Sequence, residues 1–194
     1  MLSHKEIEKS EKALLLVKTA EELFMKHGIR RVSVEEICSK GKASKVTFYK
    51  YFKNKQAVVL YILKRQFNKA MQQLKDLTDN EVPIEQILSA IMQIKIEMSK
   101  QWSEEFILDL YSFEDTREEL VALKKHTTMM WRNILESAQA KGQLRKDINI
   151  DLLLLMEDKL RELIYDDRAR KLYPSLREMA IEVGNLYFYG ILPR

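Results

Sequence analysis

The chain contains very few residues that interrupt helices. Its 194 residues include only 3 prolines and 5 glycines. Proline breaks a helix interior and glycine weakens it, so a chain with so few of both favours long helices over many turns. A chain of this length can bury a hydrophobic core, in one large domain or in two small ones. We therefore expect an all-α fold.

Capping patterns predict where the first helices begin and end. Ser3 and Glu6 have the spacing of a capping box, which predicts a first helix, and Gly28 suits the position just after its last residue. Ser33 and Glu36 repeat the capping-box spacing and predict a short second helix. The first helix is expected to be long and the second to cover less than ten residues.

A short third helix completes a familiar outline. Ser44 suits the cap of a helix over residues 45–51, and Asn54 suits the start of a long fourth helix. Two short helices joined by a glycine-containing turn outline a helix-turn-helix, whose second helix lies in the major groove of DNA. A small helical bundle without a ligand shares this outline, so the outline alone leaves both interpretations open.

The rest of the chain keeps a helical rhythm. Its breaks fall at residues 78–83, 141–149 and 172–175. The apolar run at 152–156 is far shorter than the roughly 18 residues that a membrane span needs. We predict helices over residues 84–101, 104–113, 117–140, 150–168 and 175–190.

Positive charge is concentrated near the N-terminus. Residues 1–55 carry 13 Lys and Arg against 7 Asp and Glu, a balance of +6, while the remainder carries 20 against 22, a balance of −2. Residues 37–75 contain 10 basic residues and no acidic one. Such a distribution suggests a polyanionic partner, although a solvated lysine-rich face is an equal alternative on charge alone.

Several classes of function lack their usual signals. A single cysteine, Cys38, can form no internal disulfide and supplies too few thiols for a zinc cluster, which fits a reducing cytosol. The sequence has no phosphate-binding glycine loop, no metal-ligand spacing and no nucleophile elbow. It also shows no secretory signal. We expect a cytoplasmic protein that is not an enzyme, uses no cofactor or metal and does not associate with a membrane.

Residues 19–55 resemble the DNA-binding segment of the TetR family of bacterial transcriptional repressors. The matching positions are Ala20, Leu23, Phe24, Gly28, Ser33, Val34, Ile37, Ser44, Thr47, Phe48, Tyr49, Tyr51, Phe52 and Lys55. The resemblance implies a helix-turn-helix domain over residues 1–55. It further implies a helical regulatory and dimerisation domain over residues 56–194, joined to the first by a long helix.

Three positions depart from the family pattern. Lys42 stands where the turn usually has glycine, so the turn needs either a strained φ at that lysine or a different path. Val46 stands where the recognition helix often has glycine and offers a methyl surface, for example to a thymine methyl. Cys38 replaces a common alanine and is expected to be a small buried hydrophobe.

Helical geometry separates the aromatic and basic residues of the third helix. Phe48 and Phe52 share a face and are assigned to the core. The exposed start of the helix provides the candidates for base contacts, which are Lys45, Val46, Thr47 and Lys50. The candidates for phosphate contacts are Ser33, Lys42, Ser44, Tyr49 and Lys55. Helix capping alone also explains the two serines. For Tyr51 the sequence allows either core packing or a phosphate contact.

The resemblance also implies a homodimer on a two-fold symmetric DNA operator and a small-molecule effector. The dimer would form through the last two long helices, with candidate residues Leu152, Leu155, Met156, Leu163, Met179, Val183 and Leu186. Candidates for an apolar or aromatic effector's pocket are Ile94, Met98, Trp102, Tyr111, Phe113, His126 and Met130. Each of these is also explained by ordinary core packing, and a monomer would bury the last helices as a simple core.

The leading hypothesis is a sequence-specific transcriptional regulator, a repressor that an effector releases from DNA. The alternative is a helical interaction protein whose basic N-terminal region binds nucleic acid or anionic surfaces without sequence preference. An activator of the same family is also compatible with these residues.

Overall fold

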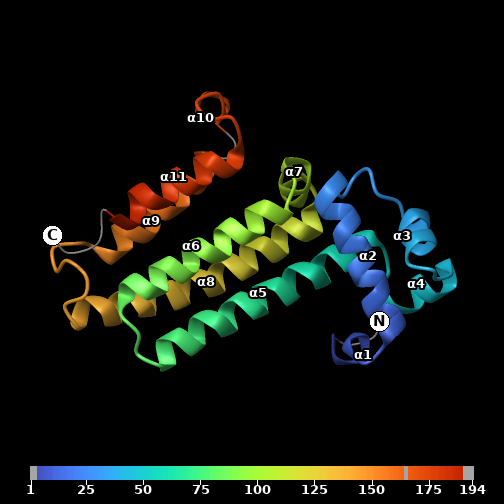
Figure 1. Ribbon diagram of the computed structural model, residues 1–194, viewed down its shortest axis with the longest axis horizontal. Coiled ribbons are helices and arrows are strands. Elements are labelled where there is room, and N and C mark those ends of the chain that lie inside the picture. The colour runs from blue at the N-terminus through green and yellow to red at the C-terminus, as the bar shows by residue number, and fades with distance from the viewer. Residues whose placement is uncertain (1–3, 164–165, 190–194) are drawn as a thin grey trace. The chain divides into compact units, whose positions relative to one another are not determined.

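The elements of regular structure in the part of the chain that the structure describes are all helices, which confirms the all-α prediction (Figure 1). The computed structural model describes residues 4–163 and 166–189. Its helices are α1 (His4–Glu8), α2 (Glu11–His27), α3 (Val34–Lys40), α4 (Lys45–Tyr51), α5 (Lys55–Asp79), α6 (Ile84–Gln101), α7 (Glu104–Ser112), α8 (Glu114–Ala140), α9 (Ile150–Glu162), α10 (Asp167–Arg170) and α11 (Leu176–Tyr189). None of the helices described is both long and apolar enough to cross a membrane.

Side-chain caps begin the helices where the sequence predicts them. The hydroxyls of Ser33 and Ser44 accept hydrogen bonds from backbone N–H groups three residues later, at 3.1 and 3.0 Å. The side-chain oxygen of Asn54 accepts one in the same way at 2.8 Å. Gly28 follows α2 with a φ of 77°, a backbone conformation that glycine adopts without a Cβ penalty. These four predicted boundaries are confirmed.

Two long predicted helices are divided by side-chain caps that the sequence patterns did not predict. The first helix was expected to start near Ser3, which lies outside the described residues, but Ser10 caps α2 and separates it from α1. The helix predicted over 150–168 ends at Glu162. Beyond it, the Asp166 carboxylate accepts two backbone N–H groups and begins the short α10. In both cases a side-chain oxygen satisfies N–H donors at a new helix start.

The chain forms two compact units. Unit 1 consists of Met1–Lys69 and Gln101–Leu123, and unit 2 of Ala70–Lys100 and Lys124–Arg194. The helices α5 and α8 therefore contribute to both units. The functional boundary predicted at residue 55 stays a prediction.

Unit 1 is built around α2, which contacts α1, α3, α4 and α7. Figure 1 shows α3 and α4 beside it. The side chains buried in its core include Leu16, Val17, Phe24, Ile37, Phe48, Phe52, Val58, Ile62, Phe106 and Leu110. Burial of aliphatic and aromatic side chains of this size stabilises the unit by about 1.5–3 kcal/mol each. The short helices α3 and α4 thus depend on packing against longer neighbours.

Unit 2 has a separate core that includes residues of α6, α8, α9 and α11. It contains Leu74, Ile84, Leu88, Trp131, Leu135, Leu153, Leu154, Tyr187 and Phe188. The Tyr187 hydroxyl donates to the carbonyl of Leu153 at 3.1 Å, which ties α11 to α9. Gly184 of α11 packs closely on α6, since a Cβ added there would lie 2.9 Å from the Met92 sulfur.

The connection between α2 and α3 is held through its peptide groups. One carboxylate oxygen of Asp109, on α7, accepts from the backbone N–H groups of Ile29 at 2.7 Å and Arg30 at 2.8 Å. Its other oxygen lies 3.2 Å from the Arg30 guanidinium. The Lys55 ammonium, at the start of α5, donates to the carbonyls of Ile29, Arg30 and Val32 at 2.7, 3.0 and 2.8 Å. Two charged side chains thus fix the segment that leads into α3. We call this arrangement the peptide clamp.

The peptide clamp predicts a cost for removing Asp109. Asp109→Ala would leave two backbone N–H groups without their acceptor, and we expect the free energy of unfolding to fall by about 1–3 kcal/mol. Urea unfolding measures this change, and faster amide hydrogen exchange at Ile29 and Arg30 should accompany it. Asp115→Ala, at an exposed position of α8, should cost less than about 1 kcal/mol. Equal effects of the two substitutions would contradict the clamp.

Candidate nucleic-acid interface

The inner face of the helix α4 packs on the core through buried aromatic side chains. Phe48 and Phe52 are 0% and 2% exposed, and their ring centroids lie 5.9 Å apart. The structure confirms their assignment to the core. Tyr51 is also buried, and its hydroxyl is 2.8 Å from that of Ser10. Tyr51 is therefore a packing residue, which settles the question that the sequence left open.

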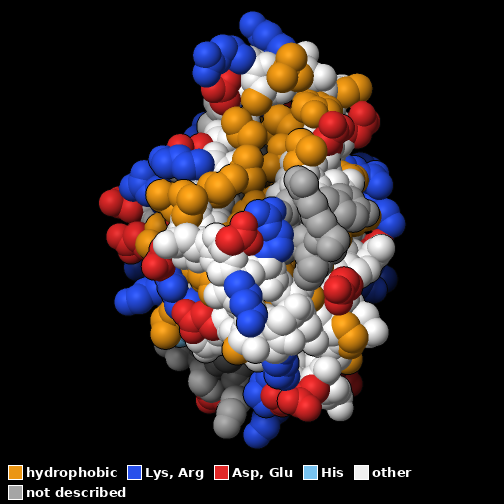
Figure 2. Space-filling view, turned by 90° about the vertical axis from the view of Figure 1, so that its left-hand side faces the viewer, with side chains coloured by type: hydrophobic (Ala, Val, Ile, Leu, Met, Phe, Trp, Pro, Cys, Tyr) orange, Lys and Arg blue, Asp and Glu red, His pale blue; other side chains and the backbone are white. Residues whose placement is uncertain are grey.

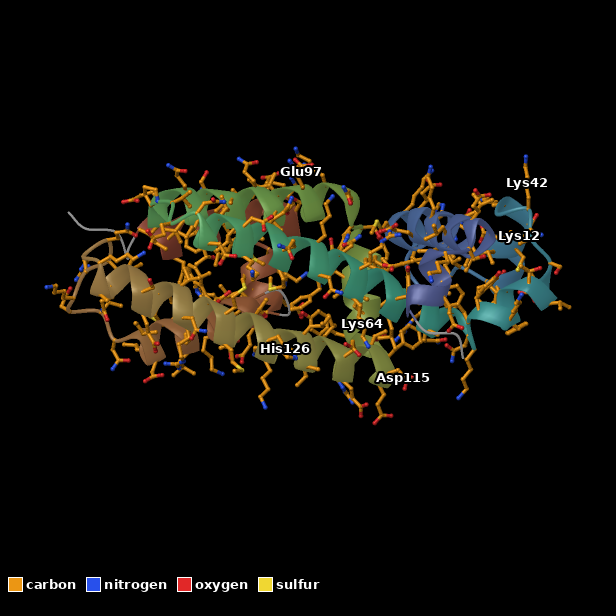
Figure 3. All side chains as sticks on the ribbon, turned by 90° about the horizontal axis from the view of Figure 1, so that it is seen from below. Lys12, Lys42, Lys64, Glu97, Asp115 and His126 are labelled. Carbon is orange, nitrogen blue, oxygen red and sulfur yellow. The ribbon has the colours of Figure 1, made fainter. Side chains whose placement is uncertain are left out.

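In the turn between α3 and α4, Lys42 adopts a left-handed backbone conformation. Its φ is 49°, whereas the preceding Gly41 has a φ of −80°. Gly41 is buried, and a Cβ added there would lie 2.9 Å from the carbonyl oxygen of Ile37. The glycine is thus required for space and the lysine adopts the positive φ, which is the strained alternative anticipated from the sequence. Figure 3 shows the Lys42 side chain projecting away from the helices.

The first turn of α4 is exposed where the third helix was predicted to contact bases. Val46 is 82% exposed and Tyr49 is 55% exposed. The Tyr49 ring stands edge-on to Phe48 with centroids 5.4 Å apart, so a buried ring supports an exposed one. Lys45 and Lys50 are exposed as well. These side chains lie exposed on one short helix that buried rings support.

The hydroxyls at the helix starts already have partners within the chain. The Ser44 hydroxyl lies 2.9 Å from the Thr47 hydroxyl and also caps α4. Ser33 caps α3 in the same manner. Thr47 is half-buried, which leaves it less available for base contacts than Lys45. Contacts from Ser33 and Ser44 to a phosphate stay predictions.

Lys55 has a different role from the one predicted. Its ammonium was expected to reach a DNA phosphate, but all three of its N–H donors are matched by the three carbonyls of the peptide clamp. Burial lowers the pKa of the Lys55 ammonium, although the nearby Asp109 carboxylate raises it. We therefore correct Lys55 from a DNA contact to a residue that positions the α2–α3 connection.

An acidic residue that the sequence reading did not assign lies beside the base-reading candidates. Glu35 of α3 forms an ion pair with Lys45 of α4, and both side chains are more than half exposed. The hydrogen bond between them raises the pKa of the Lys45 ammonium and lowers the pKa of the Glu35 carboxyl. The next residue, Glu36, instead pairs with Lys40 on its own helix at 3.0 Å. The capping-box spacing singles out Glu36, whereas no local sequence pattern singles out Glu35.

The predicted pocket residues fall into several different environments. Trp102 and Phe113 pack against the core of unit 1, whereas Ile94 and Met130 pack against the core of unit 2. Tyr111 and His126 are exposed. The side chain of Met98 lies outside the described part of the structure. The described members of this set therefore do not line one common core, and within that described part no three His, Cys, Asp or Glu side chains gather to hold a metal ion.

The predicted dimer residues are mostly exposed. Leu152, Leu155, Met156 and Leu186 are 56%, 56%, 48% and 70% exposed, whereas Leu153 and Leu154 between them are buried. Leu163 and Val183 are half-buried. Met179 is only 2% exposed, so it belongs to the core of its own chain and is corrected as an interface residue. Figure 2 shows hydrophobic side chains gathered in the upper half of its view, the region in which Figure 1 places α9, α10 and α11.

Sequence comparisons find relatives over the helix-turn-helix segment. Residues 16–62 match the profile of the bacterial regulatory proteins of the tetR family. An uncharacterised HTH-type transcriptional regulator of Bacillus subtilis (strain 168), YuxN, is 38% identical over 64 residues. That alignment covers 33% of this chain and 22% of YuxN, so the chain spans about a fifth of the length of this curated relative.

Solved structures share the fold over nearly the whole chain. Regulatory protein TetR from Rhodobacter sphaeroides gives a TM-score of 0.72 at 18% identity, over 94% of this chain and 100% of that chain. The fatty acid degradation regulator FadR from Bacillus halodurans gives 0.70 at 17%, over 94% and 97%. FadR from Bacillus subtilis, solved in complex with stearoyl-CoA, gives 0.69 at 16%, over 92% and 98%. At these identities the likeness establishes the fold.

The matched profile covers α3, α4 and the turn between them. This segment contains both the buried aromatic side chains and the exposed first turn of α4. The solved structures add the helical arrangement of the remaining chain. Residues 16–62 accordingly match the DNA-binding segment of the bacterial regulatory proteins of the tetR family, and the chain as a whole has the fold of solved regulators of that kind.

Proposed function

We propose that this chain binds a specific DNA sequence as a homodimer and represses transcription until a small-molecule effector releases it. The observation that carries the proposal is the first turn of α4, where Val46 is 82% exposed on a helix whose other face is buried. At this place in a helix-turn-helix an exposed apolar side chain can contact a thymine methyl in the major groove.

The charges around α4 suit a polyanion. Lys42, Lys45, Lys50 and Lys53 are all exposed in or next to this helix. With α4 in the major groove, Lys45 and Lys50 would approach base edges, where lysine donates to guanine O6 and N7. Lys42 and Tyr49 would contact phosphates on either side and fix the register of the helix. Both kinds of contact are needed for specific binding.

A homodimer is supported by the apolar face of unit 2. Leu152, Leu155 and Met156 of α9 and Leu186 of α11 are each about half exposed or more. Large apolar side chains grouped on a surface indicate an interface. A dimer would present two copies of α4 to two half-sites, and one short helix alone covers too little DNA for specific binding.

Effector binding is supported by the adaptable side chains of unit 2. Met71, Met92 and Met130 are partly buried against its core, and methionine side chains adjust readily to an apolar ligand. The Bacillus subtilis FadR structure with stearoyl-CoA gives one ligand with which to begin. The ligand must bind the DNA-free form more tightly than the DNA-bound form, because only differential affinity shifts the equilibrium.

The function is tested by selecting bound duplexes from a random pool and titrating the recovered sequence. We expect a two-fold symmetric site bound at least about 1000-fold more tightly than competitor DNA, with affinity that falls steeply as salt rises. Compounds including stearoyl-CoA are then screened for release of this duplex. Salt-sensitive binding without any preferred sequence would contradict the proposal and favour a non-specific polyanion-binding protein.

Replacing Lys42 separates its charge from its backbone conformation. Glycine tolerates the positive φ, so Lys42→Gly should leave the free energy of unfolding within about 1 kcal/mol of wild type. The lost phosphate contact should weaken binding to all sequences similarly and reduce the salt-dependence slope by about one. Lys42→Asn, which also tolerates this φ without a charge, should match it in DNA titrations. Unchanged affinity in both variants would remove Lys42 from the interface.

The apolar face of unit 2 is tested by placing a charge on it. Leu155→Glu should convert a dimer into a monomer, because an unpaired carboxylate would be buried at the interface. Light scattering after size exclusion gives the mass, and circular dichroism checks that the helices remain. Met129→Glu is the control, since Met129 is 59% exposed on α8. A monomeric wild type, or a dimer that survives Leu155→Glu, would contradict the proposed interface.

A further inference from the structure

The ion pair between Glu35 and Lys45 joins the two short helices on their exposed side. Glu35 lies in the first turn of α3 and Lys45 begins α4. Their side chains are 61% and 55% exposed. Exposed ion pairs contribute little to stability, so the pair has no strong structural reason to exist. Beside DNA, an unneutralised carboxylate would moreover weaken binding to every sequence.

The position of the pair bears on base reading. Lys45 is adjacent to Val46, which is 82% exposed, and both lie in the first turn of α4. In a helix-turn-helix the N-terminal residues of the second helix contact base edges. Glu35 therefore lies next to the group that the proposed function assigns to a base, and it holds the ammonium of that group in one place.

We propose that Glu35 and Lys45 act together to read one G·C base pair in the major groove. The inference rests on the proposed DNA binding and adds a residue that determines specificity. The pair presents a cationic donor and an anionic acceptor side by side. A G·C pair presents the complementary groups, with acceptors at guanine N7 and O6 and a donor at the cytosine amino group.

The same pair discriminates against A·T. In A·T the adenine amino group occupies the place of guanine O6 and thymine O4 that of the cytosine amino group. Lys45 could still donate to adenine N7 but would lose its second acceptor and lie beside a donor, while Glu35 would face an acceptor, so the Lys45 contact is weakened and the Glu35 contact becomes repulsive. Lys45 alone could donate to an acceptor on either kind of base pair, whereas with Glu35 beside it the pattern of donor and acceptor is fixed.

Glu36 supplies a matched control. It also lies in the first turn of α3 and also pairs with a lysine, but its partner Lys40 is on the same helix. Glu36→Gln removes one negative charge at nearly the same place without touching Lys45. The general electrostatic effect of removing an acid near DNA is therefore common to Glu35→Gln and Glu36→Gln. Any difference between them in base-pair preference comes from the contact of Glu35 with Lys45 and the base pair.

The test compares wild type, Glu35→Gln, Glu36→Gln and Lys45→Ala on the selected duplex and on every single-base substitution of one half-site. We expect Glu35→Gln and Lys45→Ala to lose about 5-fold or more of the discrimination against A·T at one shared G·C position, while other positions change by less than about 2-fold. Glu36→Gln should keep every preference. Circular dichroism and thermal unfolding confirm that each variant folds.

Three outcomes would overturn the inference. Glu35→Gln could retain all preferences, it could change affinity equally for every sequence as Glu36→Gln does, or it could alter a different position from Lys45→Ala. Failure of the proposed function looks different, because the wild type itself would then show no preferred sequence, and the inference would fail with it.

Discussion

The segment between α2 and α3 is held at its peptide groups by two half-buried charged side chains, and the helix-turn-helix depends on that arrangement. Asp109 of α7 accepts the N–H groups of Ile29 and Arg30, and Lys55 of α5 donates to three carbonyls of the same segment. Hydrogen bonds to charged groups are stronger than those between neutral ones. The start of α3 is thereby fixed relative to α5 and α7 within unit 1. A short turn over residues 41–44 then leads from α3 to α4.

The candidate interface is a thin exposed layer on packed aromatic side chains. Buried Phe48, Tyr51 and Phe52 hold α4, while Val46 and the lysines around it remain exposed. This separation lets the surface vary in its contacts without a cost in folding. It also explains the mixture of aromatic and basic residues over 44–55, which would suit neither a fully buried helix nor a fully solvated one. A site built on packed helices holds its side chains more firmly than one built on loops.

Local signals in the sequence predicted most of unit 1, because caps and helical periodicity depend on neighbouring residues. Ser33, Ser44 and Asn54 cap their helices as expected, and Lys42 adopts the positive φ. Contacts between distant residues were not predicted. Lys55 bonds to carbonyls more than twenty positions away, Asp109 to amides about eighty positions away, and neither has a local pattern. The pocket residues were chosen by apolar character, which core packing and ligand binding share, so the sequence could not separate the two.

We propose that α4 reads a specific duplex from the major groove as part of a symmetric pair. Hydroxyl-radical footprinting of the selected duplex tests it most directly, because it maps contacts along both strands. We expect two protected stretches related by two-fold symmetry, with centres separated by about 10 base pairs or a multiple of one helical turn. Protection spread evenly along the duplex, or a single protected stretch without symmetry, would contradict it.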